Sequence, residues 1–251
     1  MTIKLLFAFS FSLASLISNP LVGLTQLTQQ ANSDLPEPPD TGTPQAPSKP
    51  GTTRPGTTCQ TKIQKPLTAL HANNNSDFTL SEYPTFWFYV PYLPEEISNI
   101  EFLLLDGRER QTIYKTSLKL TQRPGIIKIK IPSKPEYALK SGENYRWYLQ
   151  LDCKLNQTGE PDIGVNGWVQ RKLITPELKG QLESLPSREY IAYREHGIWH
   201  DAINNLAELY AANPEDEELK DAWVNLLGSL EGLAKFAQEP FVNSELVPSE
   251  D

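Results

Sequence analysis

The chain has 251 residues, with 23 basic and 31 acidic side chains and a formal net charge of −8. This length suffices for one large domain or two small domains with a buried core. The acidic balance argues against nucleic acids and anionic membrane surfaces as partners, because both attract basic faces. The 21 prolines indicate that part of the chain is not packed, and the 2 cysteines are too few for a cysteine-rich zinc site.

The first 25 residues are typical of an export signal. Lys4 supplies a positive charge, and residues 5–17 form an uncharged apolar run that is short for a membrane-spanning helix. We therefore expect an exported protein, periplasmic or extracellular, with no transmembrane span apart from an uncleaved signal anchor. The alternative is that residues 5–17 form a buried N-terminal helix.

Residues 26–58 have the composition of a disordered, proline-rich linker. Seven prolines stand among Thr, Ser, Gly and Asp in residues 31–58, and apolar side chains are few. Such a segment cannot bury enough apolar surface to offset its chain entropy. We expect it to act as an extended spacer between the export signal and the folded part.

Residues 59–175 are expected to form an all-β domain. Apolar and polar side chains alternate in several runs, which is typical of strands with one buried face. The predicted strands cover residues 84–90, 100–105, 114–120, 127–131, 145–153 and 168–174. Turns are predicted at Asp106-Gly107, Pro124-Gly125, Ser141-Gly142 and Asn166-Gly167. This pattern favours an antiparallel sandwich that resembles immunoglobulin domains, with a barrel as the alternative.

Residues 176–242 have the apolar period of helices. Two amphipathic runs, 199–210 and 219–227, are separated by Asn213-Pro214, and Pro214 suits the first turn of the second helix. The spacing resembles one tetratricopeptide repeat, which cannot stand alone and is therefore expected to pack on the sandwich. Residues 243–251 are expected to form an acidic tail. The sequence thus predicts an α+β protein.

Five short strings occur in order along the folded part. They are Pro84-Thr-Phe-Trp-Phe-Tyr-Val-Pro-Tyr92, Arg123-Pro-Gly-Ile126, Tyr145-Arg-Trp-Tyr148, Gly167-Trp-Val-Gln-Arg171 and Gly197-Ile-Trp-His-Asp-Ala202. Together they resemble a cyanobacterial family catalogued as domain of unknown function 928, over about residues 58–242. The resemblance implies an exported protein of a cyanobacterial cell, and it transfers no catalytic residue.

The densest aromatic run, residues 86–92, is the strongest candidate for a binding surface. Alternation along a strand places Trp87 and Tyr89 on the face opposite Phe86 and Phe88. We predict a ligand or partner surface around Trp87, Tyr89, Tyr92, Trp168 and Arg171. The alternative is that both faces of the run are buried, one by a second sheet and one by the helical unit.

These features favour a non-enzymatic, exported binding or adaptor module of the cell envelope. Its expected partner is a protein or an envelope polysaccharide. The sequence contains no nucleophile-elbow motif, phosphate-binding loop or dinucleotide fingerprint, so no catalytic residue is assigned and no cofactor is expected. Two alternatives are a carbohydrate-binding envelope protein that uses surface aromatics, and a hydrolase that uses acidic residues near Trp168, such as Asp162 or Glu160.

The cysteines and histidines have structural roles in this interpretation. Cys59 and Cys153 are expected to form a disulfide because export leads to an oxidising compartment; two unpaired thiols are the alternative. His196 and His200 have a spacing that can bind metal on one helix, but the residue after His196 is a glycine, where zinc proteases carry Glu. We expect no metal site. Both histidines are expected to have capping or surface roles, and His71 is expected to lie at the surface.

Overall fold

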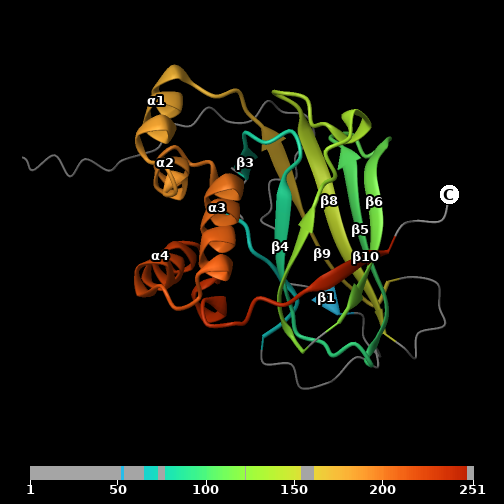
Figure 1. Cartoon of the computed structure of the whole chain (residues 1–251). Coiled ribbons are helices and arrows are strands. Elements are labelled where there is room, and N and C mark those ends of the chain that lie inside the picture. The colour runs from blue at the N-terminus through green and yellow to red at the C-terminus, as the bar shows by residue number, and fades with distance from the viewer. Residues whose placement is uncertain (1–51, 54–64, 73–76, 122, 154–160, 248–251) are drawn as a thin grey trace, which may run out of the picture. The chain divides into compact units, whose positions relative to one another are not determined.

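The computed structural model describes residues 52–53, 65–72, 77–121, 123–153 and 161–247, which all lie in one folded unit, Pro38–Asp251 (Figure 1). The predicted export signal and almost all of the predicted linker lie outside the described residues. Strands dominate up to Arg171 and helices follow, so the predicted α+β class is confirmed. Among the helices of the described part, none has the length and apolar character needed to cross a membrane.

The larger of the two described sheets has the strand order β1-β9-β8-β5-β6-β10. Its strands are Thr52–Thr53 (β1), Ile163–Arg171 (β9), Asn144–Cys153 (β8), Ile97–Asp106 (β5), Thr112–Leu120 (β6) and Ser244–Val247 (β10). A short strand, β3 (Phe78–Thr79), pairs in parallel with β9, and the other pairs are antiparallel. Because side chains alternate along β8, Trp147 and Leu149 are buried on the inner face, whereas Arg146 and Tyr148 are half-buried on the outer face.

The smaller sheet has the order β2-β4-β7 and packs face to face on the larger one. Its strands are Thr68–Ala69 (β2), Thr85–Val90 (β4) and Gly125–Lys130 (β7). All six residues of β4 are buried, so both faces of this strand are covered. The ring of Phe86 lies 5.0 Å from that of Phe102, and the ring of Phe88 lies 5.6 Å from Trp147, within the apolar core that the two sheets share.

Four helices follow the sheets in the described part of the chain. They are Pro176–Ser184 (α1), Glu189–Glu195 (α2), Trp199–Ala212 (α3) and Glu217–Gly228 (α4), with 3-10 turns at Pro135–Tyr137 (η1) and Ala234–Phe236 (η2). Helix α4 begins at Glu217 and not at the predicted Pro214. The side chain of Asp216 accepts hydrogen bonds from the Glu218 and Leu219 N–H groups, which sets this start.

The helices cover the face of the smaller sheet that points away from the larger sheet, which gives three layers (Figure 1). Trp87, Tyr89 and Ile126 form a second apolar core with residues of the helices, including Trp223. The ring of Tyr89 lies 4.9 Å from that of Phe236. The expectation that both faces of the aromatic run are buried is therefore confirmed.

Residues 240–247, here called the C-terminal strap, return from the helices to the sheets. The Ile126 N–H donates to the Pro240 carbonyl at 2.7 Å, and the Val242 N–H donates to the Ile126 carbonyl at 2.9 Å. Beyond them β10 pairs with β6, so residues 244–247 of the predicted acidic tail form an edge strand. Thr52–Thr53 in the predicted linker also pair with β9. In both cases backbone pairing with a longer strand provides order that composition alone did not predict.

Gly125→Ala is expected to weaken the attachment of the C-terminal strap. A Cβ atom at this position would lie 2.5 Å from the Pro240 carbonyl oxygen and 2.8 Å from a Val242 methyl group, so the strap would have to move. We expect the free energy of unfolding, measured by urea denaturation, to fall by about 1–3 kcal/mol. The control is Gly164→Ala, whose Cβ would meet the Leu149 oxygen at an ordinary 3.5 Å. Equal losses in both variants would contradict the close approach at Gly125.

Candidate functional site

The predicted aromatic surface is largely buried. Trp87 and Tyr89 are 5% and 7% exposed between the smaller sheet and the helices, and the Trp87 indole N–H donates to Asn204 Oδ1 at 3.1 Å. Tyr92 is 2% exposed in the core between the sheets, where burial and the nearby Glu96 raise its pKa to about 12. In this structure the three side chains are core residues and offer no face to a partner.

Trp168 lies apart from these aromatics, half-buried on the outer face of the larger sheet. The guanidinium of Arg146 lies 5.0 Å from the centroid of its indole ring and 5.2 Å from the Tyr148 ring. Arg146 also donates to Asn166 and lies 3.9 Å from the Glu109 carboxylate. The rings on this face are therefore engaged by the chain's own arginine.

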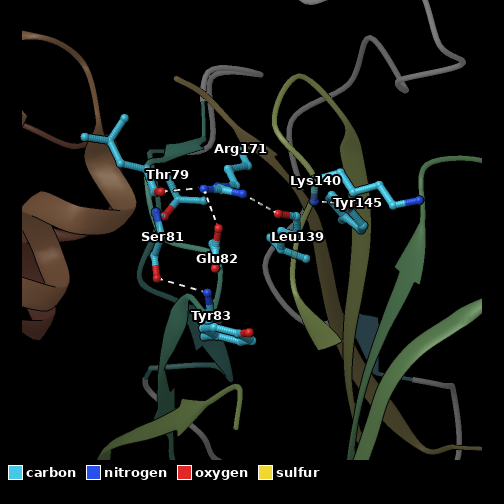
Figure 2. Close-up of polar contacts among 9 residues, drawn as sticks. Thr79, Ser81, Glu82, Tyr83, Leu139, Lys140, Tyr145 and Arg171 are labelled. Atoms are coloured by element: carbon cyan, nitrogen blue, oxygen red, sulfur yellow. Dashed lines mark hydrogen bonds and ion pairs between the residues drawn. The ribbon is translucent and has the colours of Figure 1, made fainter. Parts of the chain in front are cut away.

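Arg171 holds two loops together at one end of the sheets. Its Nε donates to the Leu80 carbonyl at 3.3 Å, one terminal nitrogen donates to the Leu139 carbonyl at 2.8 Å, and the other lies 2.9 Å from a Glu82 carboxylate oxygen (Figure 2). Figure 2 also shows the Ser81 hydroxyl accepting from the Tyr83 N–H within the loop of residues 80–83. Arg171 thus fixes a loop; it is not a free recognition group.

Arg171→Ala is expected to lower the free energy of unfolding by about 2–3 kcal/mol, because two part-buried carbonyl groups lose a charged donor. Urea denaturation measures the loss. The matched control is Arg188→Ala, which removes an exposed ion pair with Glu218 and should cost at most about 1 kcal/mol. A loss for Arg171→Ala as small as that of the control would show that the clamp does not stabilise the fold.

The loop held by Arg171 forms one wall of a cleft between the smaller sheet and α3, here called the junction cleft. Its volume is about 440 Å³. The segment before and at the start of β4 contributes Thr79, Ser81, Tyr83, Pro84 and Thr85; β7 contributes Lys128 and Lys130; α3 contributes His200, Asp201, Asn204 and Glu208. Polar groups from segments far apart in the sequence therefore converge in one cavity.

Asp201 joins the first turn of α3 to the loop before β4. Its Oδ2 accepts from the Leu80 N–H at 2.9 Å, and its carboxylate is also hydrogen-bonded to the Thr79 side chain. Burial raises the pKa of the Asp201 carboxyl to about 6, although these hydrogen bonds act in the opposite direction. The carboxyl group therefore titrates near neutral pH.

His200 stands beside Asp201 and is buried, with 6% of its surface exposed. The centroid of its ring lies 5.3 Å from that of Phe86 in a T-shaped arrangement, and its Nε2 has no hydrogen-bond partner among the described residues. Burial lowers the pKa of His200 to about 4, so the imidazole is neutral at pH 7. The prediction of a surface or capping role for His200 is therefore wrong.

A second histidine lies behind the cleft in a buried pair with Asp77. His71 Nδ1 is 2.7 Å from Asp77 Oδ2, and Asp77 Oδ1 accepts from the Ala72 N–H at 2.7 Å. Burial alone would raise the pKa of Asp77, but the charge and hydrogen bond of His71 lower it below its usual value, with help from His200. His71 is 6% exposed, so its predicted surface position is wrong.

The rim of the cleft carries most of its charge. Lys128 Nζ lies 2.7 Å from Glu208 Oε1, and both side chains are about half exposed. The same ammonium group lies 5.7 Å from the centre of the Trp87 ring. Lys130, two residues along β7, is exposed and also lines the cleft. The site thus combines a desolvated carboxyl and imidazole with solvated charges at its mouth.

The remaining predicted residues lie elsewhere. Asp162, named for a hydrolase, is buried and accepts from the Cys153 N–H at 3.0 Å, and Glu160 lies outside the described residues. Cys153 is buried at the end of β8, whereas Cys59 also lies outside the described residues, so the disulfide stays a prediction.

His196, on α2's C-terminal cap, contacts Gln181 Oε1 at 2.6 Å and is separated from His200 by the start of α3.

The residues of the junction cleft are distant from one another in the sequence, so the sequence alone did not predict that they meet. A local signal was present only for the neighbouring His71–Asp77 pair, whose members are six residues apart and do not line the cleft. Nothing local connects Thr79 or Lys128 with α3.

Comparison with known proteins identifies a family and nothing more specific. A family model described as Domain of Unknown Function (DUF928) matches residues 49–241. No match was found among curated proteins or among solved structures.

Proposed function

The chain belongs to the DUF928 family over residues 49–241, and within it we propose an exported, non-enzymatic binding module whose ligand site is the junction cleft. Its partner is an envelope polysaccharide or a protein. Export rests on the charged and apolar segments of residues 1–25 and on the proline-rich spacer that follows.

One observation carries the assignment of the site: the cleft keeps a carboxyl and an imidazole where burial opposes their ionisation. The pKa of Asp201 is raised and that of His200 is lowered, both mainly by burial. Shifted groups that lie together in a concave cavity are a recognised sign of a functional site. Binding is favoured over catalysis because the Asp201 carboxylate is already held by the Leu80 N–H and the Thr79 side chain.

A cleft-filling variant tests this proposal. The full chain and the Lys130→Trp variant would be screened by thermal unfolding against sugars, peptides and a polysaccharide fraction from cell envelopes. We expect at least one probe to raise the unfolding midpoint of the wild type and to leave Lys130→Trp unchanged. Lys115→Trp, at an exposed position on β6 of the other sheet, should respond like the wild type. A shift that persists in Lys130→Trp, or no shift with any probe, would refute the cleft as the binding site.

The proposed export has a covalent consequence. In the oxidising compartment Cys59 and Cys153 pair, so the denatured, unreduced protein should show no reactive thiol and the reduced protein should show two. A bond that closes so long a loop would stabilise the fold by about 4–5 kcal/mol in the chain-entropy model. Two reactive thiols in protein isolated from the exported fraction would contradict the pairing.

The finer fold assignment also belongs to this proposal. The two facing sheets support an immunoglobulin-like sandwich, and the two consecutive amphipathic helices α3 and α4 support a unit that resembles one tetratricopeptide repeat.

A hydrolase is the second candidate, because the raised pKa of Asp201 suits a general acid near neutral pH. Asp201→Asn would then abolish turnover of a glycoside or ester substrate and preserve binding. The binding-module proposal predicts no turnover by the wild type over a broad panel of such substrates.

A further inference from the structure

We infer that the ligand of the junction cleft is a neutral saccharide segment, an inference that rests on the proposed binding function. The hydrogen-bonding groups, the charge balance and the size of the cleft all favour such a ligand. The predicted surface aromatics Trp87 and Tyr89 play no part in it, because both are buried.

The cleft offers both donors and acceptors. The Asn204 carbonyl oxygen is taken by the Trp87 indole, which orients the amide and leaves its NH2 group as a donor. Thr85 and Ser81 line the cavity with hydroxyl groups, and Glu208 brings an acceptor to its rim. A sugar hydroxyl both donates and accepts, so it can bond to each of these groups.

The charges around the cleft cancel in pairs. Lys128 is neutralised by Glu208 at 2.7 Å. Lys130 and Asp201 then remain as one positive and one negative group. The formal charges that line the cleft therefore sum to zero, which gives no net attraction for a phosphate, an acidic sugar or a polyamine, and an uncharged ligand leaves the Lys128–Glu208 pair intact.

The size and the apolar part of the cleft also suit a short saccharide. Its volume of about 440 Å³ falls within the range of roughly 300–1,000 Å³ that is usual for small-ligand sites. Tyr83 and Pro84 contribute an aromatic ring and an aliphatic ring to the wall. Such surfaces pack against the C–H face of a sugar ring while its hydroxyl groups reach the polar residues.

Calorimetric titration of the full chain tests the inference with cellobiose, chitobiose and maltotriose as neutral probes, and with trigalacturonate, inorganic phosphate and spermine as charged probes. We expect a neutral probe to bind. Asn204→Asp keeps the acceptor for Trp87 but removes the donor, and it should weaken that binding at least tenfold. Lys130→Ala should also weaken it, whereas Lys115→Ala on β6 should not.

The outcomes separate the inference from the proposed function. If only a charged probe binds, and Lys130→Ala abolishes that binding, the inference of a neutral saccharide is overturned. The cleft then remains a binding site. Neutral-probe binding unchanged in Asn204→Asp and Lys130→Ala would place the sugar elsewhere and overturn the inference. Absence of binding by every probe would overturn it as well, and the wider screen with Lys130→Trp would then decide the proposed function. Circular dichroism of each variant verifies that it is folded.

Discussion

Trp87→Ala is expected to lower the free energy of unfolding by about 3–5 kcal/mol, as is typical for removing a buried Trp ring. Trp87 lies in β4 between the smaller sheet and the helices, and its ring is 5.6 Å from that of Phe241 in the C-terminal strap. The substitution also leaves the Asn204 carbonyl without its indole donor. Urea denaturation of the full chain measures the loss.

Phe88→Ala is the matched comparison, because Phe88 is the next residue of the same strand and faces the opposite core. Its loss should be similar, about 3–5 kcal/mol. Lys128→Ala, at an exposed position of β7, should cost at most about 1 kcal/mol. If Phe88→Ala is severe and Trp87→Ala is as mild as Lys128→Ala, the helices do not bury Trp87 and its role as a binding surface regains support.

Side-chain periodicity predicted the strands well because each long strand has one face in the core. The alternation over residues 145–153 corresponds to β8, and the lysines at 128 and 130 mark the exposed face of β7. The dense aromatic run predicted a strand, which is β4, and its burial on both faces corresponds to the alternative to the predicted binding surface. The apolar stripe of residues 199–210 likewise predicted α3.

Local turn signals failed where long-range packing decided the structure. Asn166-Gly167 is typical of a turn, yet both residues lie within β9. Gly167 pairs with Trp147 on β8, and a residue without a side chain accommodates a large neighbour on the inner face. β10 was missed for a related reason, because a four-residue strand is recognisable only by the partner strand that it joins.

The candidate site was beyond sequence reasoning for the same reason. Asp201 bonds to Leu80, 121 positions earlier, and Lys128 pairs with Glu208, 80 positions later. Arg171 was predicted to belong to a partner surface, but its contacts with Leu80 and Leu139 assign it a clamping role instead of a recognition role. The residue type indicated that Arg171 makes polar contacts, and only the fold shows which groups its guanidinium contacts.

The neighbouring residues His200 and Asp201 should give the protein two opposing pH dependences. The pKa of His200 is about 4 in the folded state and 6.5 for the free side chain, so the unfolded chain binds the extra proton and stability falls as pH drops from 6.5 to 4. The pKa of Asp201 is about 6 against 3.8, so the folded state binds the extra proton and stability rises as pH drops from 6 to 3.8. Each effect is about 3 kcal/mol, and in the wild type they nearly cancel.

Single substitutions should expose each dependence. In Asp201→Asn only the histidine remains, so the free energy of unfolding should fall by about 2–3 kcal/mol between pH 7 and pH 4.5. In His200→Gln only the carboxyl remains, so the same acidification should raise it by about 2 kcal/mol relative to the wild-type trend. Urea denaturation at both pH values gives the change for each variant, from which a constant cost of the substitution drops out, and this change is then compared with that of the wild type.

His196→Gln is the control for this pair. His196 is half-buried on the C-terminal cap of α2 and contacts Gln181 outside the cleft, so an effect of His196→Gln as large as that of His200→Gln would show that the pH dependence is not specific to the cleft. Because the opposing slopes arise from burial at the start of α3, they should survive high salt, which screens exposed charges far more than buried ones. Parallel pH trends in Asp201→Asn and His200→Gln would show that the two side chains are solvated. The junction cleft would then lack the buried carboxyl and imidazole on which its assignment as a binding site rests.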